Sequence, residues 1–248
     1  MTAVLSWDWW LLPLSGSSTH YLPEWAVWHA RTMVLGWALL MPVGALAARY
    51  WKITARQNWP HTLDNKRWWR IHQFCQYGAC IAVVAGAALA WNQGSGSGAS
   101  ALWHHWLGWG ITAIAALQVA SGLVRGTKGG PTEPQLRGDH YDMTAHRRWF
   151  ERWHKSVGWL LLAVAIAVIA LGLVAADAPR WMPAVLALWW LTLAGLAWRW
   201  QAQGRCTDTY AAIWGPDPGH PGNQLTPIGW GIRRLGAPRR PAPHSSTL

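Results

Sequence analysis

The chain alternates between long apolar stretches and shorter polar ones. Five stretches each hold about 20 mostly apolar residues, which is the length that an α-helix needs to cross a lipid bilayer. They are Trp28–Tyr50, Ile71–Trp91, Trp103–Val124, Trp153–Ala176 and Trp181–Trp200. The pattern predicts an all-α fold, an integral membrane helical bundle with five transmembrane helices. The opening apolar stretch Trp7–Leu14 is too short to cross, and no basic segment or cleavage site indicates a secretory signal.

The basic residues predict how the bundle is oriented. Of the 21 Lys and Arg residues, only Arg31 and Arg180 fall on the side of the membrane where the first helix begins. Cytoplasmic loops carry the excess of Lys and Arg, so we expect the N-terminus outside and the C-terminus in the cytoplasm of a bacterial-type inner (plasma) membrane. Many of the 24 tryptophans flank the span ends, where aromatic residues meet lipid headgroups.

Three regions follow from this organisation. They are a periplasmic N-terminal segment, 1–25, a transmembrane domain, 26–200, and a cytoplasmic C-terminal tail, 201–248. The tail is rich in Pro, Gly and Arg, which predicts an extended segment that either is disordered or binds the membrane surface or a partner. The net charge of +11 reflects topology, and no basic helix or aromatic-interleaved motif indicates nucleic-acid binding.

Four histidines lie close to the starts of the first four predicted helices. Because alternate helices start on opposite faces of a membrane, His29 and His104 are expected near the outer face and His72 and His154 near the cytoplasmic face. Two imidazoles at one depth on different helices are the axial ligands that a b-type haem iron needs. The spacing therefore predicts two haem b groups, bound by the pairs His29/His104 and His72/His154.

Two of these histidines share a local motif. Trp103-His104-x-x-x-Gly108 recurs as Trp153-His154-x-x-x-Gly158, and residues four apart lie on one helix face. Gly108 and Gly158 are therefore expected to let a flat macrocycle approach the backbone. Close helix packing is a second interpretation, and the two uses are compatible. His105 competes with His104, but the glycine spacing favours His104.

Four ordered segments resemble the cytochrome b561 family, especially its DOMON-associated branch. The stretch WHARTMVLGWALLMPVGALAARY is similar to the first ligand helix and WRIHQFCQ to the second. The spacing of His104 to Gln118 and Arg125 resembles the third, and GDHYDMTAHRRWFERWHKSVGW the fourth. The resemblance implies two non-covalent b haems held by the first with third and the second with fourth ligand helices. The helix that precedes the first ligand helix in that family, and the DOMON domain, have no counterpart, which suggests that a redox partner or a second copy covers the exposed flank.

Several polar residues are expected around the haems. Arg49 and Arg152 are candidates for pairing with propionates, or for attracting an anionic reductant such as ascorbate, at the cytoplasmic end. Arg31 is the corresponding candidate on the outer face. Gln76 and Gln118 are polar residues within predicted spans, where such groups usually face the bundle interior.

The predicted function is transmembrane electron transfer between a small-molecule or protein donor and acceptor. Whether the chain is a reductase of ferric chelates or monodehydroascorbate, or is linked to quinol, stays open. One alternative is a non-catalytic haem subunit of a larger redox or photosynthetic complex, and another is a haem-free transporter or scaffold. The three cysteines form no CxxCH motif, so covalent haem is not indicated.

Overall fold

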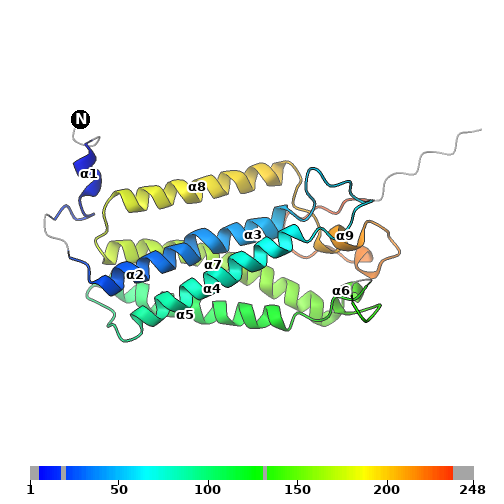
Figure 1. The fold of residues 1–248 in the computed structure, drawn as a ribbon, viewed down its shortest axis with the longest axis horizontal. Helices are drawn as coiled ribbons and strands as arrows, with labels where there is room; N and C mark the ends of the chain where they lie inside the picture. The colour runs from blue at the N-terminus through cyan, green and yellow to red at the C-terminus, as the bar shows by residue number, and fades with distance from the viewer. Residues whose placement is uncertain (1–5, 18–20, 131–132, 237–248) are drawn as a thin grey trace, which may run out of the picture.

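The computed structural model describes residues 6–17, 21–130 and 133–236 of the chain, and these residues form a bundle of long helices (Figure 1). The helices in chain order are α1 (Trp7–Leu11), α2 (Glu24–Met33), the π-helix η2 (Val34–Leu40), α3 (Met41–Tyr50), α4 (Arg67–Ala90), α5 (Ala99–Leu123), α6 (Asp139–Asp142), α7 (Ala145–Ala175), α8 (Trp181–Ala202), α9 (Thr209–Trp214) and the 3-10 helix η3 (Pro221–Gln224). The described residues contain no strand, only two isolated bridges.

Five segments are long and apolar enough to cross a membrane, which confirms the all-α, five-span prediction. They are Glu24–Tyr50, formed by α2, η2 and α3 together, and the helices α4, α5, α7 and α8. Successive spans run in opposite directions, so the bundle has two distinct ends (Figure 1). We call them the α1 end and the α9 end, after the short helix at each.

The first span changes from α- to π-helix at its centre. Pro42 has no N–H, so the carbonyl of Ala38, four residues earlier, loses its α-helical donor. The indole Nε1–H of Trp189 on α8 donates to this carbonyl at 2.8 Å. The hydrogen bond ties α8 to the first span, although few α8 side chains are buried.

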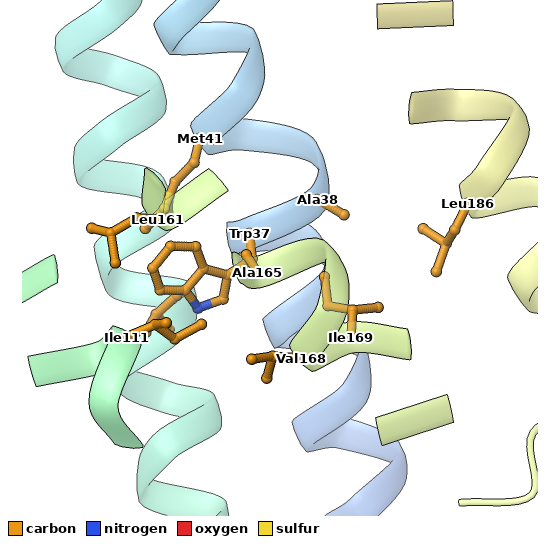
Figure 2. Close-up of a cluster of buried hydrophobic side chains, with 11 residues drawn as sticks. Trp37, Ala38, Met41, Ile111, Leu161, Ala165, Val168, Ile169 and Leu186 are labelled. Atoms are coloured by element: carbon orange, nitrogen blue, oxygen red, sulfur yellow. The ribbon is translucent and has the colours of Figure 1, made fainter. Parts of the chain in front are cut away.

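The core lies at mid-height of the bundle, where the first span meets α4, α5 and α7. Trp37 is 4% exposed and its indole ring lies among Met41, Ile111 and Leu161 (Figure 2). Ala38 and Ala79 are fully buried there, and small residues of this kind let helix backbones approach closely in membranes. Apolar side chains therefore fill the middle of the bundle, between its two ends.

The helix α7 begins at Ala145, eight residues before the predicted span. Its extra turns are polar, so a hydropathy pattern does not detect them. Thr144 caps the helix by accepting a hydrogen bond from the backbone N–H of Arg147. Buried Glu151 then pairs with Arg147 at 3.1 Å and with Lys155 at 2.6 Å, one helix turn to either side.

The C-terminal segment is folded over the α9 end as far as the structure describes it, to residue 236, so the expected extended tail is wrong for residues 203–236. Three buried or half-buried cations from the bundle donate to its backbone carbonyls. Lys52 Nζ reaches Thr207 O at 3.1 Å. Lys155 Nζ reaches Ile228 O at 2.9 Å, and Arg49 Nη2 reaches Trp230 O at 3.0 Å.

At the α1 end, the short N-terminal segment packs on the loop between α7 and α8. Ser15 donates to the carboxylate of Asp177 through both its N–H and its Oγ, at 2.8 and 2.6 Å. The Arg180 guanidinium lies 4.5 Å from the ring centre of Trp9. The segment therefore covers the start of α8.

Candidate haem-binding sites

The structure brings the first predicted histidine pair together near the α1 end. The ring centres of His29 on α2 and His104 on α5 are 5.9 Å apart, with their planes at 82°. His29 Nδ1 lies 2.9 Å from the carbonyl oxygen of Gly86 on α4. His104 Nδ1 lies 2.9 Å from the carbonyl oxygen of Val168 on α7. Four spans thus contribute to this site.

The second pair meets near the α9 end. The ring centres of His72 on α4 and His154 on α7 are 6.3 Å apart, with their planes at 76°. His72 Nδ1 lies 3.1 Å from the carbonyl oxygen of Gly44 on α3. His154 Nδ1 is buried and has no hydrogen-bond partner among the described residues. The Phe150 ring stacks on the His154 imidazole with its centre 5.2 Å away.

The ring-centre separations of both pairs match the separation expected for two imidazoles on one iron. A metal-to-nitrogen bond of about 2 Å on each side, with roughly 1 Å from nitrogen to ring centre, separates the ring centres by about 6 Å. A carbonyl can only accept, so the Nδ1 atoms of His29, His72 and His104 carry the hydrogen. Their Nε2 atoms then present a lone pair, as in most metal-bound histidines. The residues present therefore fit a bis-histidine haem at each end.

Three glycines that the sequence reasoning did not single out make these hydrogen bonds possible. A Cβ at Gly172 would lie 2.7 Å from the His104 ring. A Cβ at Gly44 would lie 2.6 Å from the amide of Gln76, and one at Gly86 would lie 2.6 Å from Thr32 Oγ1. Each glycine therefore lets a neighbouring helix come close enough for an imidazole to reach a backbone carbonyl.

Gly108 and Gly158, the two glycines predicted to make room for a macrocycle, are in more open surroundings. A Cβ at Gly158 would meet nothing within 4 Å, and one at Gly108 would only touch Val168 at 4.0 Å. Close helix packing, the second interpretation of these residues, therefore does not account for either position. Space beside both glycines is what the macrocycle interpretation needs, and the role itself stays a prediction.

The two sites are joined by a fixed spacing on two helices. On α4, His72 precedes Gly86, which anchors His29, by 14 residues. On α7, His154 precedes Val168, which anchors His104, also by 14 residues. At about 1.5 Å per residue this is about 21 Å, and 14 residues are close to four full turns. One face of each helix therefore serves both sites.

The arginines predicted to face the haems are arranged differently from one another. Arg49 is 9% exposed and is engaged by the C-terminal segment, with its guanidinium 4.0 Å from the Trp230 ring centre. Its hydrogen bonds to Trp230 O, Tyr50 and Gln201 give it a structural role in the described residues. Arg152 is exposed on α7, and Arg31 is exposed beside Trp28, 4.9 Å from that ring centre.

Arg125 is a cation at the α9-end site that the sequence reasoning noted only as part of a motif. Its guanidinium lies 4.3 Å from the ring centre of Trp69. The Trp69 ring in turn stacks on the His72 imidazole, with ring centres 5.9 Å apart and an interplanar angle of 29°. Burial is the main reason that the pKa of Arg125 is lowered from its ordinary value, with Arg147 adding to the effect.

The remaining candidates also have defined places. His105 packs edge-on against Trp106 and takes no part in the pair. Gln76 Nε2 donates to the carbonyl of Met41 at 3.1 Å. Gln118 is 8% exposed, and neither polar atom of its amide has a partner among the described residues.

A helical membrane bundle with an imidazole pair near each end is typical of membrane haem proteins. Comparisons with known proteins then identify the family. The model of the family described as eukaryotic cytochrome b561 matches residues 28–178. The chain therefore belongs to the cytochrome b561 family, whose members are membrane proteins that carry electrons with b-type haem. The resemblance found in the sequence is confirmed, and the chain is a multi-pass membrane protein.

Two similar proteins come from Arabidopsis thaliana, each described as a cytochrome b561 and DOMON domain-containing protein. Both are 32% identical to this chain over 92 residues, which is 37% of this chain. The matched part is 22% of the length of one relative and 21% of the other. No solved structure is a significant match to the chain. Because these relatives are plant proteins, the bacterial-type inner membrane stays a prediction.

Proposed function

We propose that this chain transfers single electrons across a membrane through two bis-histidine b haems, one held near each end of the bundle. The observation that carries the proposal is the pair of imidazole constellations, with ring centres 5.9 and 6.3 Å apart. Haem b, when bound, supplies an iron that changes by one electron between its ferrous and ferric states. The two histidines of each pair would hold that iron as its protein ligands and would leave no open position for a substrate.

The bundle supports transfer between the two sites in two ways. The 14-residue spacing on α4 and α7 holds the pairs at opposite ends of the same helices. The apolar core around Trp37 excludes water from the region between them. An ion that entered this region would lose its hydration. The apolar core therefore favours electron transfer over ion movement between the two ends.

We further propose that the α1 end faces the outside and the α9 end the cytoplasm. The loops and the C-terminal segment at the α9 end carry most of the Lys and Arg residues, which supports this orientation.

Quantitation of haem in the purified chain tests the proposal. We expect two haem b per chain by pyridine haemochrome, and one in His72→Ala, in His154→Ala and in the double variant. His105→Ala is the matched control, since His105 lies beside a ligand in the sequence but outside the pair, and it should keep two. An unchanged haem count in His72→Ala would refute the assignment at the α9 end.

A further inference from the structure

Three of the four paired histidines have a backbone carbonyl for Nδ1, and the fourth does not. His154 Nδ1 is buried and lacks a partner among the described residues. Gln118, on the neighbouring helix α5, has a complementary deficit, since its Oε1 and Nε2 are also buried and lack partners among the described residues. An unsatisfied buried polar atom costs about 1–3 kcal/mol, so two on neighbouring helices call for an explanation.

The packing of α5 against α7 puts these two residues at the same level. The helices run antiparallel and contact each other along their length. His104 on α5 reaches Val168 on α7. Seven residues further along α5, Ile111 lies in the same buried cluster as Leu161, seven residues back along α7. Seven residues are close to two turns, so each step stays on the contact face.

The next step of seven residues brings Gln118 of α5 opposite His154 of α7. Gln118 is 8% exposed, as a residue on the contact face should be, whereas most of α5 faces outward. This series of facing positions on α5 and α7 therefore has a histidine at each end, His104 on α5 and His154 on α7. For His104 the partner is a carbonyl of the facing helix. For His154 the group of the facing helix at that level is a side-chain amide.

We propose that Gln118 is a positioning residue for His154, whose Nδ1–H donates to Gln118 Oε1 when the iron is bound at Nε2. This rests on the proposed haem function and assigns Gln118 a task that the other three histidines leave to the backbone. A hydrogen bond at Nδ1 fixes the ring orientation and makes Nε2 a stronger electron donor to the metal. Stronger donation stabilises the ferric state, so the bond lowers the reduction potential of the haem at the α9 end.

The test is a redox titration of the full-length holoprotein with three variants. Gln118→Met keeps the length of the side chain but removes the acceptor, and should raise the potential of the α9-end haem only. Gln118→Glu keeps a carbonyl-type acceptor and should hold that potential at or below the wild-type value. Thr192→Val is the matched control, since the exposed Thr192 hydroxyl on α8 bonds its own helix at Leu188 O, away from both histidine pairs, and it should change neither potential.

The outcomes separate this proposal from the one on which it rests. If Gln118→Met binds two haems and leaves both potentials unchanged, Gln118 does not anchor His154. The same conclusion follows if Gln118→Met and Gln118→Glu shift the potential alike, because that would reflect packing. If the wild-type chain binds fewer than two haems, or His154→Ala still binds two, the proposed function itself fails.

Discussion

Gly172→Ala is the sharpest test of the α1-end site, because the perturbation is one methyl group. Its Cβ would lie 2.7 Å from His104 Cε1 and 2.8 Å from Nδ1. Carbon atoms pack best at about 3.5–4.0 Å, so the imidazole must retreat by about 1 Å. Nδ1 lies 2.9 Å from Val168 O, and such a retreat takes it out of hydrogen-bond range.

The energetic consequence follows from two terms. Overpacking a tight contact costs about 1–3 kcal/mol, and losing the hydrogen bond costs about 1 kcal/mol more. Since each 1.4 kcal/mol is tenfold, haem affinity at this site should fall by a factor of roughly 30 to 700. The α9-end site shares no contact with this methyl group, so its affinity should not change.

Haem transfer to an excess of apomyoglobin measures this difference. One haem should leave Gly172→Ala much faster than either leaves the wild type, and the other should leave at the wild-type rate. Gly195→Ala on α8 is the control, because a Cβ there meets nothing within 4 Å. Two haems retained at wild-type rates in Gly172→Ala would show that His104 is not held where we place it.

Two further predictions concern the other end of the bundle. A Cβ at Gly158 would meet nothing within 4 Å, and Gly158→Leu should fill this space and lose the α9-end haem. The control Gly195→Leu should keep both haems. Equal haem counts in the two variants would mean that Gly158 faces only lipid. Burial, and next the charge of Arg147, lowers the pKa of His140 to about 3. The folded state thus prefers neutral His140, and its stability should fall as pH drops from about 6.5 towards 3, by about 1.4 kcal/mol per unit. Amide hydrogen exchange of α9 between pH 7 and 5 measures this. His140→Phe should flatten the slope, the exposed His146→Phe should not, and a slope unchanged in His140→Phe would contradict the assignment.

The spans and the histidine pairing could be predicted from the sequence because both depend on simple periodic rules. Hydropathy locates four of the five crossings to within about a turn at both ends, and alternation of direction sorts four histidines into two levels. His29 and His104, and likewise His72 and His154, do meet. The extra turns of α7 were missed because they are held by a Thr144 cap and ion pairs rather than by apolar residues.

The supporting contacts could not be predicted because they involve backbone carbonyls, which every residue has. The identities of Gly44, Gly86 and Val168 do not indicate that their backbone carbonyl oxygens accept hydrogen bonds from imidazoles. The folded C-terminal segment escaped prediction for the same reason, since its anchors to Lys52 and Lys155 are carbonyls too. A composition rich in Pro, Gly and Arg gives no sign of such anchoring.

The equal interval on α4 and α7 makes the number of residues between the two levels as important to the site geometry as the histidines themselves. A single residue inserted between His72 and Gly86 would turn everything beyond it by about 100° and move it by about 1.5 Å. The carbonyl that serves His29 would then point away, although every residue involved was still present. A substitution on the outward face of either helix would leave this interval unchanged, whereas an insertion or deletion between the two levels would break the register between one histidine pair and the other.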